Sequence, residues 1–173
     1  MFPGHSVLQV PVPQLEEYVR ARTIHHDASY LSTDPTFVHA HVTALGPFVD
    51  ELTDDVERRV AAIAAETAPF DFVLERMGRF GDGTLHLLPE PDAAFRALTA
   101  RLVAEFPEHP PYAGAFTDLI PHLTVDLVSE DVTAESTLAL IGAAIPARCR
   151  AEHLELVWYE PHATRVLHRW RLG

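Results

Sequence analysis

One short pattern occurs twice in this chain, and both copies stand in segments that predict β-strands. His41-Val42-Thr43 lies in the first segment, and His122-Leu123-Thr124 lies in the second. Successive side chains of a strand point to opposite faces, so the histidine and the threonine of each copy share one face. The apolar residues on the opposite faces are Val42, Ala44, Leu123 and Val125. A polar pair that recurs with this geometry predicts a functional site.

The segments after the two copies follow the same order. Counted from His41, a helix, a hairpin and a final strand are expected near +12, +29 and +43, and from His122 they are expected near +11, +26 and +43. A period of about 81 residues is too long for a solenoid. The repeat predicts an α+β, duplicated bilobal fold, with two antiparallel-sheet lobes and flanking helices around a central cleft. We expect residues 1–173 to form a single bilobal domain.

The individual elements are predicted from side-chain alternation, helix caps and turn residues. Besides the two motif strands, the expected strands are residues 6–12, 70–79, 84–88, 148–159 and 165–172. The expected helices are residues 14–22, a segment capped by Thr53, residues 91–106 and residues 133–144. Gly81-Asp82-Gly83 is typical of a hairpin turn.

Charge and composition limit the class of partner. The chain has 25 acidic against 13 basic residues, all of them arginine, and a formal net charge of −12. Such a chain is poorly suited to long nucleic acid, which proteins hold through many phosphate contacts. A small nucleotide or an RNA terminus is the expected partner. No apolar run reaches the roughly 18 residues of a membrane span, and no signal peptide is recognisable, so we expect a cytoplasmic monomer without a membrane partner.

Other common chemistries lack their sequence patterns. Cys149 is the only cysteine, which excludes an intrachain disulfide and a cysteine-based zinc cluster, and it is expected to be a small buried hydrophobe. The chain has no Gly-x-x-x-x-Gly-Lys loop, Gly-x-Gly-x-x-Gly turn or Gly-x-Ser-x-Gly elbow. Nucleotide triphosphatase, dinucleotide-binding and serine-hydrolase activities are therefore not indicated.

Two histidines and two hydroxyl groups in one cleft are suited to acid–base chemistry on a phosphate ester. Histidine titrates near pH 6.5, so one imidazole can accept a proton while the other donates one. Threonine hydroxyls can donate hydrogen bonds to the oxygens on which charge accumulates. This chemistry requires no metal or other cofactor.

The paired motif and its surroundings resemble the two-histidine (2H) phosphoesterase superfamily, which includes 2′-5′ RNA ligase-like proteins and cyclic phosphodiesterases. The supporting stretches are residues 39–48, 85–91 and 116–125. The resemblance implies a LigT-like bilobal fold, metal-independent catalysis, and substrates with 2′,3′-cyclic or 2′-5′-linked phosphates. It implies that His41 and His122 are the catalytic acid–base pair and that Thr43 and Thr124 bind phosphate. Hydrolysis is favoured over ligation, because the acidic surface offers little to hold two RNA strands.

Several neighbouring residues have alternative interpretations. His39 shares a strand face with His41, and His-x-His is also a metal-ligand spacing. A rim or second-layer position is favoured over a metal site completed by residues 25–27, and a plain exposed histidine is the remaining alternative. Tyr112 and Phe116 are candidates for a rim that stacks on a base, with core packing as the alternative.

Two further questions concern substrate choice and activity. Arg76 and Arg79 are either phosphate ligands or ordinary solvated arginines beside a hairpin. Gly46 stands where relatives often carry a bulkier residue, which suggests a wider cleft wall. The alternative function is a catalytically inactive nucleotide-binding module of the same fold.

Overall fold

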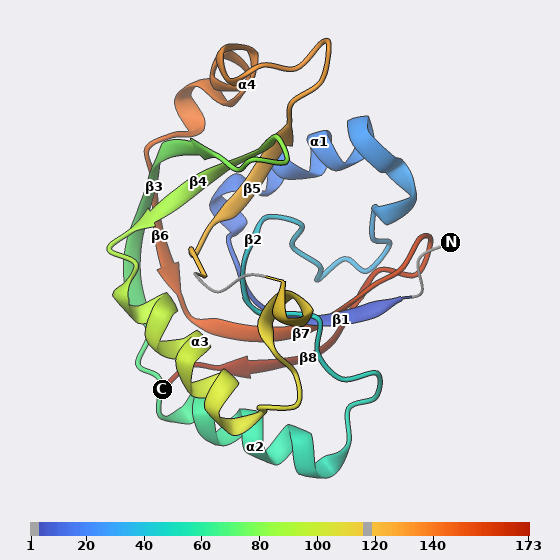
Figure 1. Cartoon of the computed structure of the whole chain (residues 1–173), viewed down its shortest axis with the longest axis vertical. Coiled ribbons are helices and arrows are strands. Elements are labelled where there is room, and N and C mark those ends of the chain that lie inside the picture. The colour runs from blue at the N-terminus through green and yellow to red at the C-terminus, as the bar shows by residue number, and fades with distance from the viewer. Residues whose placement is uncertain (1–3, 116–118) are drawn as a thin grey trace.

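The computed structural model describes residues 4–115 and 119–173 and contains two antiparallel sheets of four strands each. In the first sheet the strand order is β2 (His41–Leu45), β1 (His5–Pro11), β7 (His153–Tyr159) and β8 (Arg165–Arg171). In the second sheet the order is β5 (Leu123–Leu127), β4 (Thr84–Glu90), β3 (Phe70–Arg79) and β6 (Ala147–Ala151). The expected α+β class with two antiparallel sheets is confirmed (Figure 1).

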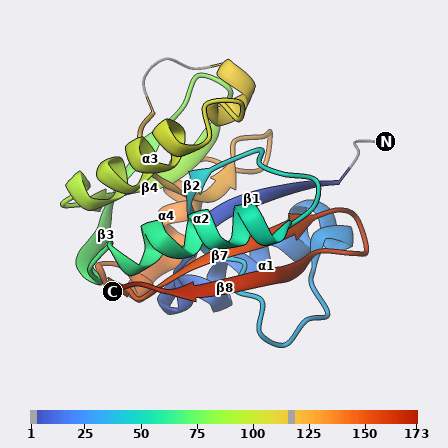
Figure 2. The ribbon, with the colours of Figure 1, turned by 90° about the horizontal axis from the view of Figure 1, so that it is seen from below.

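Four α-helices accompany the sheets in the described part of the chain. They are α1 (Glu16–Asp27), α2 (Asp54–Ala65), α3 (Ala93–Glu105) and α4 (Ala134–Ile141). The Thr53 side chain accepts a hydrogen bond from the Val56 amide at the start of α2, and Thr133 and Ser136 form a capping box at the start of α4. Figure 2 shows α2 lying along the first sheet, with α3 beside it.

The two sheets do not correspond to the two halves of the sequence repeat. β2 belongs to the first sheet, but the β3–β4 hairpin that follows it belongs to the second. β5 belongs to the second sheet, and the β7–β8 hairpin that follows it belongs to the first. Each motif strand is therefore packed in a sheet completed by the other half of the chain. Sequence order alone carries no information about this exchange of hairpins.

Two expected element boundaries are wrong. The predicted strand 148–159 is two strands in different sheets, β6 and β7, which are separated at the exposed residue Glu152. β6 alternates between buried and exposed residues, whereas residues 154–157 of β7 are all buried, so the two strands lie in different surroundings. The predicted helix 14–22 begins as a 3-10 turn (Pro13–Leu15) and continues as α1 to Asp27, because no glycine or proline interrupts it.

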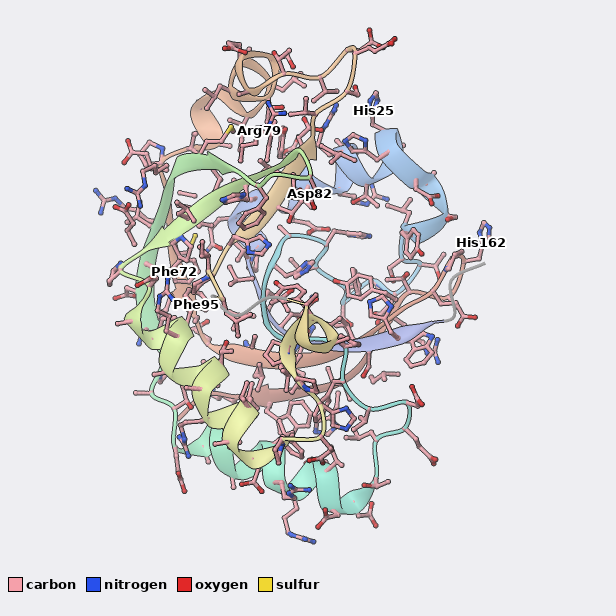
Figure 3. All side chains as sticks on the ribbon, viewed as in Figure 1. His25, Phe72, Arg79, Asp82, Phe95 and His162 are labelled. Carbon is pink, nitrogen blue, oxygen red and sulfur yellow. The ribbon has the colours of Figure 1, made fainter. Side chains whose placement is uncertain are left out.

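A continuous cluster of buried apolar side chains joins the inner layers of the molecule. It includes Leu8 and Val42 from the first sheet and Leu87 and Leu123 from the second, all fully buried. Phe72 of β3 and Phe95 of α3 pack edge to face, with ring centroids 4.9 Å apart (Figure 3). Other buried members include Val10, Leu85, Leu98, Leu102 and Leu156. This packing fixes β2 and β5, the two strands that carry the motifs.

Candidate active site

The two motif strands lie against each other at the edges of their sheets. β2 is the edge strand of the first sheet, β5 is the edge strand of the second, and the two are in contact (Figure 1). Val42 and Leu123 are fully buried, whereas His41 and His122 are partly exposed. The division of faces expected from strand alternation is observed in both copies, and it turns a polar edge of each sheet toward the other.

Both motif histidines are held by the same local hydrogen bond. The Nδ1 atom of His41 lies 2.7 Å from the carbonyl oxygen of His39, and the Nδ1 atom of His122 lies 2.8 Å from the carbonyl oxygen of Ile120. A carbonyl oxygen only accepts, so Nδ1 carries the proton in both rings. The Nε2 atoms therefore hold the lone pair that can accept a proton from a substrate or from water.

The electrostatic environment keeps both imidazoles neutral at pH 7. The pKa of His41 is lowered to about 4, mainly by burial and also by the nearby His122 and His39 rings, against the opposing effects of the hydrogen bond to the His39 carbonyl and the charge of Glu16. Burial also lowers the pKa of His122, while the Ile120 carbonyl and Asp82 oppose that shift. An anion bound between the two rings would raise both pKa values.

Each motif histidine has an aromatic neighbour on, or just after, the strand that lies two places from the motif strand in the same sheet. The Tyr159 ring, at the end of β7, lies 5.8 Å from the His41 ring. The Phe80 ring, just after β3, lies 4.8 Å from the His122 ring and stacks on His86 at 3.9 Å. These neighbours occupy equivalent places but differ in chemistry, since only Tyr159 carries a hydroxyl group.

Two cavities share His41 in their walls. The first, of about 410 Å³, extends toward α1 and also contacts Thr124, Thr84 and Arg22. The second, of about 660 Å³, contacts Thr43 and is lined by aromatic and apolar residues that include His5, Tyr30 and Tyr112. Tyr30 and Tyr159 line both cavities. Three of the motif residues thus lie where a polar chamber and a more apolar chamber meet, whereas His122 lines neither chamber.

Asp126 connects the second motif to α1. It follows a register shift between β5 and β4 and is fully buried, with Arg22 Nη2 donating at 2.9 Å, His26 Nε2 at 2.6 Å and Thr137 Oγ1 at 2.8 Å. Burial would raise the Asp126 pKa, but the hydrogen bonds from His26, Arg22 and Thr137 outweigh it and the pKa is lowered. This ionised carboxylate fixes one wall of the polar chamber.

His39 is occupied on both ring nitrogens. Its Nδ1 atom lies 2.6 Å from Glu16 Oε1, and its Nε2 atom accepts from the Ser32 amide at 3.1 Å. Its carbonyl oxygen holds His41. Both ring nitrogens of His39 therefore have partners within the protein, and its second-layer role stays a prediction. Among residues 4–115 and 119–173, no group of three or more His, Cys, Asp or Glu side chains is arranged to hold a metal ion.

The remaining candidates are dispersed. Tyr112 lines the apolar chamber, and its amide donates to the Gly46 carbonyl oxygen at 2.6 Å. Phe116 lies outside the described residues. Arg76 forms an exposed ion pair with Glu90 at 3.3 Å, and Arg79 is exposed next to the β3–β4 turn (Figure 3). Neither arginine lines the two chambers that contain His41.

Gly46 is explained by packing. A Cβ atom at this position would lie 3.1 Å from a methyl group of Val7, which is tighter than ordinary contact. The glycine therefore accommodates Val7 of β1, in addition to lining the apolar chamber.

Sequence reasoning missed Asp126 and Tyr159. The first has only a weak local signal: it is two residues from Thr124, but the register of β5 with β4 shifts between them, so simple alternation does not place it. The second has none: Tyr159 is 118 residues from His41 in the sequence and reaches it only through the pairing of β1 with β7.

The fold and the motif-bearing strands define the class: an α+β protein with the architecture of LigT-like phosphoesterases. The model of the 2′-5′ RNA ligase superfamily matches residues 11–163, and the chain belongs to this family. The membership is consistent with the 2H phosphoesterase superfamily and with a phosphodiesterase-type enzyme in general.

Solved structures support the fold. The chain is similar to E.coli LigT complexed with 3′-AMP, with a TM-score of 0.62, 18% identity and 99% of each chain covered. A structure described as a phosphoesterase gives a TM-score of 0.61 at 19% identity, with 99% of each chain covered. The protein TT0787 of Thermus thermophilus gives 0.58 at 20% identity, with 97% of each chain covered. Among curated proteins, none matches the chain.

No helix in the described part of the chain is long and apolar enough to cross a membrane.

Proposed function

We propose that the chain is a metal-independent phosphoesterase that acts on 2′,3′-cyclic phosphate or 2′-5′ phosphodiester bonds of small nucleotides or RNA ends. The observation that carries the proposal is the matched pair of imidazoles. Each has Nδ1 fixed by a backbone carbonyl, which leaves Nε2 of His41 and of His122 for proton transfer. The family membership supports the same chemistry.

In the proposed reaction a phosphate group lies between the two histidines. One imidazole takes a proton from the attacking water as its oxygen bonds to phosphorus, and the other imidazolium gives a proton to the ribose oxygen as the P–O bond breaks. Thr43 and Thr124 donate to the non-bridging oxygens, where negative charge accumulates. Because both histidines are neutral in the free protein, the anionic substrate itself favours the protonated form of one of them.

The chambers on either side support a small substrate. The more apolar chamber, with Tyr30 and Tyr112 in its wall, has the size and the aromatic character for a nucleobase. The formal charge of −12 disfavours a long RNA and any product that requires two strands to be held together. LigT has been crystallised with 3′-AMP, ATP and NADP+, which are all small nucleotides.

The test is turnover of a nucleoside 2′,3′-cyclic phosphate and of a 2′-5′-linked dinucleotide in the presence of a chelator. The wild-type chain should be active, and His41→Ala or His122→Ala should each lower kcat by about 10²–10⁴-fold. The matched control is His162→Asn. His162 is exposed and lines neither chamber that contains His41 (Figure 3), and asparagine tolerates the left-handed backbone of this position. Wild-type turnover in both alanine variants would disprove the assignment, and nucleotide binding without turnover would favour the inactive module.

A further inference from the structure

A chain of buried polar groups begins behind His41. The Tyr159 hydroxyl oxygen lies 3.3 Å from His41 Nδ1 and donates to Gln9 Oε1 at 2.6 Å. Burial raises the pKa of Tyr159, so the hydroxyl keeps its proton. It can therefore accept a second, longer branch of the Nδ1–H hydrogen bond that His41 donates to the His39 carbonyl, while it donates to the Gln9 amide oxygen.

The same chain of groups continues toward a buried carboxylate. Gln9 on β1 and Glu155 on β7 are directly opposite each other in the sheet, and both are fully buried. Gln9 Nε2 and Glu155 Oε1 are the two atoms of this pair that have no hydrogen-bond partner. One is a donor and the other an acceptor, and cross-strand partners have Cβ atoms only about 5 Å apart. The other carboxylate oxygen of Glu155 accepts from Arg169 Nε at 2.7 Å.

The donors of this series follow one another in one direction. The imidazole shares its proton with the hydroxyl, the hydroxyl donates to the amide oxygen, and the amide nitrogen is an unpartnered donor on the residue directly across the sheet from the unpartnered carboxylate oxygen. Such a series is polarised by charge at either end, and hydrogen bonds in a series strengthen one another. Positive charge on His41 and negative charge on Glu155 therefore favour each other through the chain.

Within residues 4–115 and 119–173, the second motif has no equivalent series. Gln9 is opposite Thr43 in the first sheet, and the residue opposite Thr124 in the second sheet is His86. The aromatic neighbour of His122 is Phe80, which has no hydroxyl group. The two catalytic candidates thus differ in what supports them, although their backbone hydrogen bonds are the same.

We propose that Tyr159 and Gln9 are positioning residues that orient His41 and couple its protonation to the buried Glu155 carboxylate. The inference rests on the proposed function only in taking His41 as an acid–base residue. The other titratable groups that act on His41 are His122, His39 and Glu16. None of these belongs to the series, so it can be tested separately from them.

The test is an NMR titration of the His41 and His122 imidazoles in the full chain with saturating sulfate, a tetrahedral anion that takes the place of phosphate. Tyr159→Phe keeps the ring and removes the hydroxyl, and Glu155→Gln removes the charge. Each variant should lower the His41 midpoint by about half a pH unit or more, because each withdraws stabilisation from the imidazolium form. The His122 midpoint should stay unchanged. In the double variant the two shifts should be less than additive, since both interrupt one series.

The matched control is Trp158→Phe, which removes a hydrogen bond to Glu160 from the neighbouring residue on β7 and should change neither midpoint. Thermal unfolding of each variant verifies that it is folded. If Glu155→Gln is unfolded, Gln9→Leu replaces it and should give the same shift. An unchanged His41 midpoint in folded Tyr159→Phe, or an equal shift of His122, would overturn the proposal. The titration requires no turnover, so loss of the proposed enzymatic activity would not be mistaken for loss of this coupling.

Discussion

The Asp126→Asn variant tests whether the carboxylate behind the second motif holds α1 against β5. Asp126 has no exposed side-chain surface, and its partner Arg22 is only 14% exposed. The asparagine has nearly the same shape but carries no charge, and its NH₂ group would face a donor. The substitution therefore removes the charge from the hydrogen bonds with Arg22 and Thr137.

The expected magnitude follows from these contacts. A hydrogen bond to a charged group contributes about 1.5–3 kcal/mol, and leaving one partner of a buried ion pair without the other costs about 3–5 kcal/mol. His26 is 35% exposed and adds little after solvent screening. We expect a loss of about 3 kcal/mol in the free energy of unfolding, which for a chain of this length lowers Tm by roughly 6–12 °C.

The assay is thermal unfolding at pH 7, followed by circular dichroism. Asp71→Asn is the matched control, because Asp71 pairs with Arg150 at 2.9 Å but is 75% exposed, and its loss should not change Tm measurably. The pKa of Asp126 is lower in the folded protein than in the unfolded chain. The stabilisation of the fold by Asp126 is therefore fully present above the unfolded pKa, and it is lost as the pH falls through the folded pKa. Equal Tm values for the two variants at pH 7 would refute the reasoning.

Three further outcomes are expected. Burial lowers the pKa of His41 to about 4 and the pKa of His122 below 6.5. The pH profile of kcat/KM should therefore be bell-shaped, with its maximum on the acid side of pH 6.5. A maximum above pH 7.5 would contradict this. Thr124→Val should lower kcat by about 10²-fold with little change in Tm, as stopped assays and circular dichroism would measure. A Cβ atom in Gly78→Ala would lie 2.5 Å from His86 Nε2, so this variant should lose about 1–3 kcal/mol of stability in urea titrations, whereas Gly81→Ala, with open space around it, should not.

Much of the local structure was predictable because its causes are local. The cap at Thr53, the turn at 81–83 and the alternation around Val42 and Leu123 each depend on residues within one element. The shared Nδ1 geometry also has a local cause, since each histidine bonds to a carbonyl two residues earlier on its own segment.

The candidate site was predictable only in part. The motifs themselves identified two histidines and two threonines, and their roles stay predictions until turnover is measured. Tyr159 and Gln9 come from strands whose neighbours are decided by sheet order, and no pattern around His41 points to them. Phe116 lies outside the described residues, so its proposed rim position also stays a prediction.

The sequence by itself determined the two polar strands, the equal spacing of their surroundings and an acidic character that favours a small partner, because periodicity, caps and charge act over short distances. Only the tertiary structure decided that the hairpins after β2 and β5 exchange sheets, that β6 and β7 separate at Glu152, and that His41 is supported by Tyr159 while His122 faces Phe80. These features depend on which strands pair across long separations in the chain, and that choice is made by burying one shared core.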